Sequence, residues 1–238
     1  MTELYSNLQG CKIIQNANLF TIEFTYPSPV VCHSLVKTRI LRGATISDDY
    51  KQVIFKAYSV QLYCQEMQAH KSNMAATLAA SLGGQLKYMI DVLGHSFLGF
   101  NAENIIVIDG DRCAFLDCDL VCKINGDNET IMVNNLFNDY DFFVSPELKV
   151  KVLTKKVHYK TAYFSLGCLL LYTLLGKEIF DGIYQEYLLA ANNNSTNNNS
   201  TAIFLKYMDL SPYKETKLYW LICRCLVEEP EKRSILFF

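Results

Sequence analysis

The sequence predicts an α+β fold, with a strand-rich N-terminal part and a mainly helical C-terminal part. Residues 1–56 are rich in β-forming residues, whereas helix formers dominate several later segments. The chain has 238 residues, of which 50% are hydrophobic and 19% are charged. This composition excludes intrinsic disorder and a simple coiled coil, and the length predicts one compact domain with room for two lobes.

Two strands are expected in the N-terminal part. Alternating β-forming residues over Leu19–Tyr26 predict the first strand, which the run Pro27-Ser28-Pro29 ends. A second, short strand is predicted over Gln52–Phe55. The remaining residues of this part show no regular period.

Apolar residues at helical spacing predict a long helix over 74–93. Gly83 and Gly84 weaken its middle by about 1 kcal/mol each relative to alanine. Three further helices are expected at about 160–175, 183–190 and 215–227. The first of these is apolar on every side, which predicts a helix buried in the middle of a domain.

A β-hairpin is the sharpest local prediction. The apolar runs Ile105–Ile108 and Cys113–Leu116 are joined through Asp109-Gly110, a typical hairpin turn. The following residues, 118–145, show little periodicity and predict a long irregular segment that serves a function, with a loop at Asn125–Glu129.

An asparagine-rich segment at 191–201 cannot build a core and is expected to be a disordered surface insertion. The net charge is −2, from 22 basic and 24 acidic residues. Such a balance gives no electrostatic signature of nucleic-acid or anionic membrane partners, so neither is expected. The longest uncharged apolar run, between Lys160 and Lys177, is shorter than the roughly 20 residues that span a bilayer.

Nine cysteines are dispersed through apolar stretches, and their number is odd. The closely spaced pairs Cys118/Cys122 and Cys223/Cys225 lack the C-x2-C pairing of a structural zinc site. The N-terminus has no basic start followed by an apolar stretch, as a signal peptide would have. We therefore expect reduced, mostly buried thiols in a cytoplasmic protein.

Five short segments occur in the order and spacing of motifs in the C-terminal lobe of protein kinases. They resemble the end of H-R-D-x-K-P-x-N-I, then D-F-G, A-P-E, W-S-L-G-C-x-L and C-L-x-x-D-P-x-x-R. The segments are Asn101–Ile105, Asp117–Asp119, Ser145–Glu147, Phe164–Leu170 and Cys225–Arg233. The chain thus resembles the protein kinase-like superfamily over about residues 57–233.

This resemblance implies a kinase-like fold with a reduced, β-rich N-lobe at 1–56 and a mainly helical C-lobe at 57–238. No G-x-G-x-x-G motif is present. Pro27–Val31 resembles the H-P-N-I-V turn before the fourth strand of the N-lobe, so the first strands are expected to be missing. Lys12 is then the remaining candidate for the lysine that contacts ATP.

The resemblance also assigns roles to four residues. In kinases the catalytic-loop Asn and the D-F-G Asp hold Mg²⁺ against the phosphates of ATP, which implies Asn104 and Asp117 as candidate ligands of Mg-ATP. The A-P-E Glu and a late Arg form a buried ion pair that braces the lobe. Glu147 and Arg233 preserve these two residues.

The departures from the family pattern fall where the chemistry should be. Gly99 stands at the position of the catalytic Asp, and Asn101 replaces the catalytic-loop Lys. Ala162 stands where the buried helix of a kinase carries an Asp that anchors the catalytic loop. Glycine has no group that accepts a proton, so the sequence predicts loss of phosphoryl transfer.

We therefore expect an inactive serine/threonine kinase-like protein, a pseudokinase, that binds a kinase, a kinase substrate or a regulator. The alternative is an unconventional ATP-dependent kinase that uses Asn104 and Asp117 for Mg²⁺, with His95 or Asp119 as the base. A structural role for His95 is favoured. A third alternative is a decaying gene product, which a cooperative unfolding transition would contradict.

A basic cluster follows Ser145–Glu147. Its members are Lys149, Lys151, Lys155, Lys156, His158 and Lys160. We interpret it as a solvated basic face, with attraction of an acidic partner as the alternative.

Overall fold

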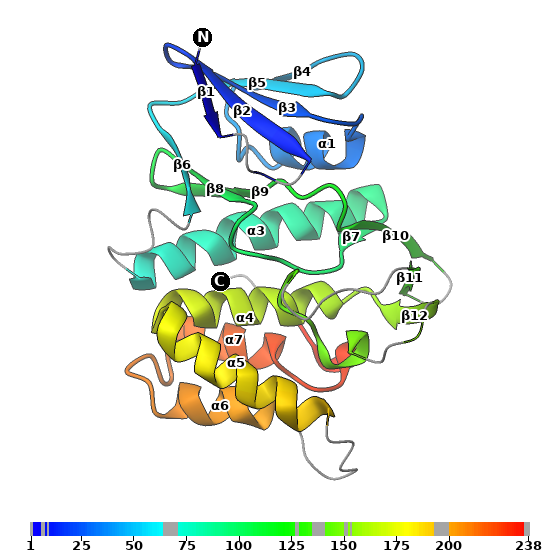
Figure 1. The fold of residues 1–238 in the computed structure, drawn as a ribbon, viewed down its shortest axis with the longest axis vertical. Coiled ribbons are helices and arrows are strands. Elements are labelled where there is room, and N and C mark those ends of the chain that lie inside the picture. Colours follow the sequence, from blue (N-terminus) through cyan, green and yellow to red (C-terminus); the bar gives the residue numbers. More distant parts are fainter. Residues whose placement is uncertain are drawn as a thin grey trace. The chain divides into compact units, whose positions relative to one another are not determined.

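The structure is a computed structural model, drawn as a ribbon in Figure 1. It describes residues 2–5, 8, 10–63, 71–126, 129–134, 141–149, 152, 154–192 and 200–235. The chain divides into two compact units. The first unit comprises Met1–Ala69, Thr77–Phe97 and Ala102–Lys123, and the second comprises His70–Ala76, Leu98–Asn101 and Ile124–Phe238.

Several expectations from the sequence lie outside the described residues. Cys64, Lys151 and most of the asparagine-rich segment, 193–199, belong to this group. The lobe boundary after residue 56 remains a prediction, because the two units are defined by packing and each is built from several pieces of chain.

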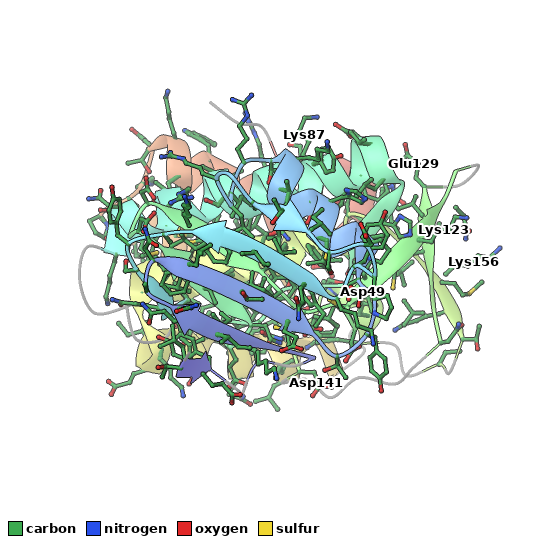
Figure 2. The ribbon with its side chains drawn as sticks, turned by 90° about the horizontal axis from the view of Figure 1, so that it is seen from above. Asp49, Lys87, Lys123, Glu129, Asp141 and Lys156 are labelled. Atoms are coloured by element: carbon green, nitrogen blue, oxygen red, sulfur yellow. The ribbon has the colours of Figure 1, made fainter. Side chains whose placement is uncertain are left out.

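A five-stranded antiparallel sheet begins the first unit, and Figure 2 looks down on it. Its strands are β1 (Thr2–Tyr5), β2 (Cys11–Asn16), β3 (Leu19–Phe24), β4 (Thr45–Ile46) and β5 (Gln52–Lys56), in the order β1-β2-β3-β5-β4. Strand residues alternate between the two faces, and Phe20, Ile22 and Phe24 of β3 are all buried on the core side. Both strands predicted for this part are confirmed.

Helix α1 (Pro29–Lys37) follows β3, and this corrects the expectation for Pro27–Val31. We expected a turn directly before a strand, but Pro29 occupies the first turn of a helix, where its missing N–H costs nothing. Val31 and Leu35, one turn apart, bury the inner face of α1. Three strands precede this helix, so the expectation that the first strands are missing is wrong.

Helix α3 (Lys71–Leu93) confirms the predicted long helix and begins three residues earlier than expected. Its fully buried Gln85 lies in the first unit and pairs with the backbone of Phe115, donating to the carbonyl at 3.0 Å and accepting from the N–H at 3.1 Å. The same amide donates to Ser34 of α1 at 3.1 Å. The buried Gln85 amide of α3 thus links β9 and α1, and its hydrogen-bonding groups are satisfied.

The predicted hairpin is present as β8 (Ile105–Ile108) and β9 (Arg112–Phe115), and β6 (Val60–Leu62) extends it to three strands. Asp109 and Gly110 both have positive φ, 54° and 75°, as a two-residue hairpin turn requires. The Asp109 carboxylate also accepts hydrogen bonds from the backbone N–H groups of Tyr58 and Ser59. The turn therefore anchors the segment that enters β6.

The segment expected to be irregular after residue 118 contains strands, and this expectation was wrong for its first half. In the first unit, β7 (His95–Phe97) pairs with the start of β10 (Val121–Asn125). In the second unit, the end of β10 pairs with β11 (Thr130–Val133), and β11 pairs with β12 (Lys155–His158). The predicted loop after Asn125 connects β10 to β11.

Four helices form the core of the second unit: α4 (Thr161–Leu175), α5 (Lys177–Asn192), α6 (Ala202–Asp209) and α7 (Lys217–Cys225). Helix α4 is buried on nearly every side and packs against α5 and α7, as Figure 1 shows. At Gly167 a Cβ atom would lie 2.8 Å from the Cβ of Cys225, so glycine permits the close approach of α7. The three predicted helices are confirmed, whereas α6 was not predicted.

The described elements show a mixed architecture of helices and antiparallel sheets, which is consistent with the α+β class. The predicted class is confirmed at this level. Among the described helices, none combines the length and the apolar character needed to cross a membrane.

Candidate functional site

Asn104 and Asp117, the residues implied as Mg²⁺ ligands, lie side by side in the first unit. Asn104 directly precedes β8, and Asp117 follows β9 by two residues, so the hairpin brings their side chains to its open end. The Asn104 amide donates to Asp117 Oδ2 at 2.9 Å. Asn104 is 4% exposed and Asp117 1% exposed, so the pair is buried.

The second oxygen of Asp117 is also engaged. Its Oδ1 accepts the backbone N–H of Asp119 at 3.0 Å. Carboxylate and amide oxygens are the donors that Mg²⁺ prefers, and a carboxylate oxygen that accepts one hydrogen bond has a second acceptor site. Within the described ranges, no three His, Cys, Asp or Glu side chains come together as a metal site. The assignment of Asn104 and Asp117 as ligands of Mg-ATP stays a prediction.

Thiols lie near the Asp117 carboxylate. The pKa of Cys11 is raised to about 12, mainly by burial and to a smaller extent by the nearby Cys118 and Asp117. Burial raises the pKa of Cys118 to about 11, against a lowering hydrogen bond with Ser28, and Asp117 raises it further. Both thiols therefore stay protonated at neutral pH and add no negative charge beside Asp117.

Lys12 does not reach this pair. Strand residues alternate, so Lys12 extends from the face of β2 opposite to the buried Cys11 and Ile13. Its ammonium pairs with Glu23 Oε2 at 3.0 Å, and both side chains are partly exposed. Lys12 and Glu23 line a separate cavity of about 420 Å³, with Lys51. The candidate lysine for ATP therefore serves a cross-strand ion pair.

Gly99, in the second unit, marks the position expected to hold the catalytic Asp. A Cβ atom at this position would lie 2.3 Å from Cδ2 of Phe142 and 2.9 Å from Oγ of Ser165. Such distances are far below van der Waals contact, and the Phe142 ring is 2% exposed. The space that a larger side chain would need is filled by packed protein.

Ser165 of α4 fixes the backbone next to Gly99. Its hydroxyl accepts the Phe100 N–H at 2.7 Å and donates to the Phe100 carbonyl at 3.2 Å. Ala162 is fully buried and its methyl group forms no such bond. Sequence reasoning noted the loss of the anchoring Asp at Ala162 but missed Ser165, one turn further along the same helix. Asn101 also has a structural contact, from its amide to the Asp141 carbonyl at 3.2 Å.

Glu147 and Arg233 meet in the second unit. Glu147 lies in a 3-10 helix, Pro146–Leu148, and Arg233 follows another, Pro230–Lys232. The guanidinium donates to both carboxylate oxygens, at 2.6 and 2.9 Å, and Arg233 is fully buried. Arg233 also donates to the carbonyls of Val227 and Glu228 at 2.7 and 2.8 Å. The buried charge is therefore paired and its donors are used.

His95 and Asp119, the alternative bases, line one cavity of about 340 Å³ in the first unit. His95 Nδ1 lies 2.6 Å from the Leu93 carbonyl, which fixes Nδ1 as the donor. In the neutral ring this leaves Nε2 as a hydrogen-bond acceptor. A histidine that acts as a base is oriented by the same kind of bond, so the structural role favoured for His95 stays a prediction.

The expected basic face is corrected by the structure, because most members of the described cluster have partners within the second unit. Lys149 Nζ lies 3.9 Å from the centre of the Tyr187 ring. Lys155 donates to the Glu147 carbonyl, Lys160 donates to the Glu231 carbonyl, and His158 contacts the Glu129 carboxylate at 3.2 Å. Lys156, labelled in Figure 2, is exposed. The cluster secures loops more than it forms a charged surface.

The cysteines that the structure describes form no disulfide among themselves. Burial is the main cause that raises the pKa of Cys113 and of Cys225 to about 12.

No protein-family model matches the chain, and no curated protein matches it in sequence.

Proposed function

We propose that this chain is a catalytically inactive protein kinase-like domain that works as a binding or regulatory module. The observation that carries the proposal is the packing at Gly99. The position where the resemblance expects the catalytic Asp has no side chain, and the Phe142 ring and the Ser165 hydroxyl occupy the space around it. A proton acceptor is therefore missing, and removal of such a group lowers rates by about 10² to 10⁴.

The first unit supports the same proposal. In a kinase, a strand lysine and a glutamate on the following helix form an ion pair that active enzymes require. Here β3 is followed by α1, β4 and β5, as the helix and two strands follow the lysine strand in kinases. Strand β3 contains no lysine, and α1 contains no acidic residue. Both members of the pair are absent from these elements.

The second unit supports a retained scaffold. The Glu147–Arg233 pair is buried and bidentate, and its loss would leave an uncompensated charge in the core. The chain thus keeps the brace implied by the resemblance while the chemistry at Gly99 is lost. We infer that the fold serves recognition, with a kinase, a kinase substrate or a regulator as the partner class.

Phosphoryl transfer tests the proposal. The purified full chain is incubated with radiolabelled ATP, Mg²⁺ and general protein substrates, beside Asp117→Asn as a matched variant. We expect equal background incorporation from both proteins. Transfer that persists through purification and disappears in Asp117→Asn would overturn the proposal and favour the unconventional enzyme with His95 or Asp119 as its base.

Nucleotide binding is tested separately by thermal unfolding with and without millimolar Mg-ATP. Because no G-x-G-x-x-G motif is present and the candidate ATP lysine, Lys12, is paired with Glu23, we expect no shift in Tm. A ligand at 100 times its Kd would stabilise by about 2.7 kcal/mol, a rise of a few degrees. Such a rise, lost in Asp117→Ala, would contradict this expectation. A sharp single transition would also exclude the decaying gene product.

The binding role is tested with the immobilised chain and purified kinases, their substrates and their regulators. Saturable binding to one of these classes is the expected result, and failure of all three would overturn the role.

A cytoplasmic location is part of the proposal. It is supported by the eight described cysteines, of which five are buried and which form no disulfide among themselves.

A further inference from the structure

The first unit contains a cavity of about 340 Å³ to which the proposed function assigns no ligand. Its walls come from the residues between β3 and α1, the start of α1, β7, the start of β10 and the turn that follows Asp117. Neither Asn104 nor Asp117 lines it. The volume lies in the range of cavities that hold small organic ligands.

Part of the wall is apolar. Pro27, Pro29, Val30 and Val31 lie directly before α1 and in its first turn, and all four line the cavity. Tyr26 also lines it and is 73% exposed. Proline rings and a phenol ring offer flat apolar surfaces, which favour a planar, apolar ligand.

His95 of β7 provides a hydrogen-bond acceptor at this cavity. Its Nδ1 donates to the Leu93 carbonyl at 2.6 Å, so Nε2 of the neutral ring carries a lone pair. Within the part of the chain that the structure describes, Nε2 has no hydrogen-bond partner and is not enclosed by protein. A ligand in the cavity can therefore donate an N–H to Nε2, whereas a carboxylate cannot bind there.

The charged groups at the cavity oppose one another. The Asp119 carboxylate lines the cavity and repels an anion, whereas Lys123, labelled in Figure 2, lines it as well and repels a cation. The first turn of α1 contains no acidic residue, so the positive end of the helix dipole also disfavours a cation. Since neither sign of charge is favoured, the cavity selects an uncharged ligand.

We propose that this cavity binds a small, uncharged aromatic heterocycle that carries one N–H donor. Its ring lies against the prolines and valines at the start of α1, and its N–H donates to Nε2 of His95. The site is independent of the proposed function, because it requires neither an inactive kinase-like fold nor a protein partner.

Indole is the probe, and benzofuran is its counterpart of nearly the same shape, with an oxygen in place of the N–H. Binding to the full chain is measured at pH 8 by ligand-observed NMR and by calorimetry. We expect a Kd for indole on the order of 1 mM or lower. Benzofuran should bind about fivefold more weakly, because its oxygen cannot donate to Nε2. Benzoate and benzamidine, which carry one charge of either sign, should also bind more weakly than indole.

His95→Phe keeps an aromatic ring and removes Nε2. We expect about a fivefold loss of indole affinity and no loss of benzofuran affinity, so the two probes should become nearly equal. The retained benzofuran affinity would also show that the cavity is intact in this variant. His33→Phe is the matched control, because it makes the same change at a histidine of α1 that does not line the cavity, and we expect no effect.

Three further variants test the place and the charge of the site. Val30→Trp fills the cavity from the α1 side and should abolish binding of both probes. Asp119→Asn and Lys123→Met each remove a charge from the wall. Both should change indole affinity by less than about twofold, because indole is uncharged.

Absence of indole binding to the wild-type chain would overturn the proposal. Equal affinity for indole and benzofuran would overturn it as well, and so would tighter binding of benzoate or benzamidine. An unchanged indole affinity in His95→Phe, or retained binding in a folded Val30→Trp, would place the probe elsewhere and also overturn it. If these two variants do not unfold cooperatively, the comparison of indole with benzofuran on the wild-type chain decides.

Discussion

Two positions in the second unit differ in whether a charged side chain is present and paired. At Glu147 and Arg233 a buried ion pair is present with its hydrogen bonds complete. At Gly99, where the resemblance expects a carboxylate, an aromatic ring and a hydroxyl fill the space. A buried charge persists in a fold when partners surround it, and a charge needed only for chemistry can be replaced by packing. The comparison therefore separates what holds the fold from what would make it an enzyme.

The largest expected effect comes from the ion pair. Arg233→Met leaves Glu147 without its main partner, and we expect a loss of about 3–5 kcal/mol in the free energy of unfolding. Denaturant unfolding of the full chain measures it. The matched control is Lys232→Met, which breaks the exposed pair with Glu229 and should cost at most about 1 kcal/mol. Similar losses from both variants would show that the buried Glu147–Arg233 pair stabilises the fold no more than an exposed ion pair does.

Gly99→Ala tests the filled position. Its Cβ would lie 2.3 Å from the Phe142 ring, so we expect about 3 kcal/mol of destabilisation from overpacking. Gly84→Ala is the control, because no atom lies within 4 Å of its added Cβ and alanine favours the helix. In the double variant with Phe142→Leu, the two losses should be less than additive. Strict additivity would show that the ring and position 99 do not compete for space.

Ser165→Ala removes both hydrogen bonds to the Phe100 backbone and leaves a buried N–H without its partner. We expect a loss of about 1–2 kcal/mol in the same unfolding measurement. Ser211→Ala, in the loop after α6, serves as the control and should change stability by less than half of that. An unchanged stability in Ser165→Ala would mean that these two hydrogen bonds do not hold the segment at Gly99 in place.

The smallest effect concerns pH and extends the comparison to the thiols of both units. Burial raises the pKa of Cys118 to about 11 and that of Cys225 to about 12, above the usual 8.5. Unfolded thiols therefore ionise first as the pH rises, and each ionisation favours the unfolded chain. We expect constant Tm between about pH 7 and 8.5 and a progressive fall toward pH 11.

Alkylation by iodoacetamide, followed by mass spectrometry, assigns this effect to individual cysteines. Cys118 should become reactive at a lower pH than Cys225, and both should resist modification at pH 7 relative to the unfolded chain. The reverse order of reactivity would contradict the assignment.

Local sequence signals predicted the elements that local physics determines. The Asp109-Gly110 turn requires positive φ at both positions, and this requirement is visible in the residue types. The long apolar run of α4 and the helical periodicity of α3 likewise predicted these two helices. Helix α1 was missed because two prolines suggested a turn, although Pro29 after Ser28 is also a helix start.

The site was predictable only in part. The 13-residue step between Asn104 and Asp117, across a hairpin, was enough to place their side chains together. Phe142 and Ser165 were not predictable, because each meets Gly99 across 40 or more residues of chain and only tertiary packing brings them there. The cavity lined by His95 and Lys123 depends on strand register, which no local motif encodes.

The Phe142 ring beside Gly99 also has an evolutionary consequence. A single substitution that introduces a carboxylate at position 99 would collide with the ring, and a single substitution that removes the ring would leave a void in the core. Each substitution alone therefore lowers the free energy of unfolding. A stable chain with a carboxylate at position 99 requires two coordinated changes, one at each position.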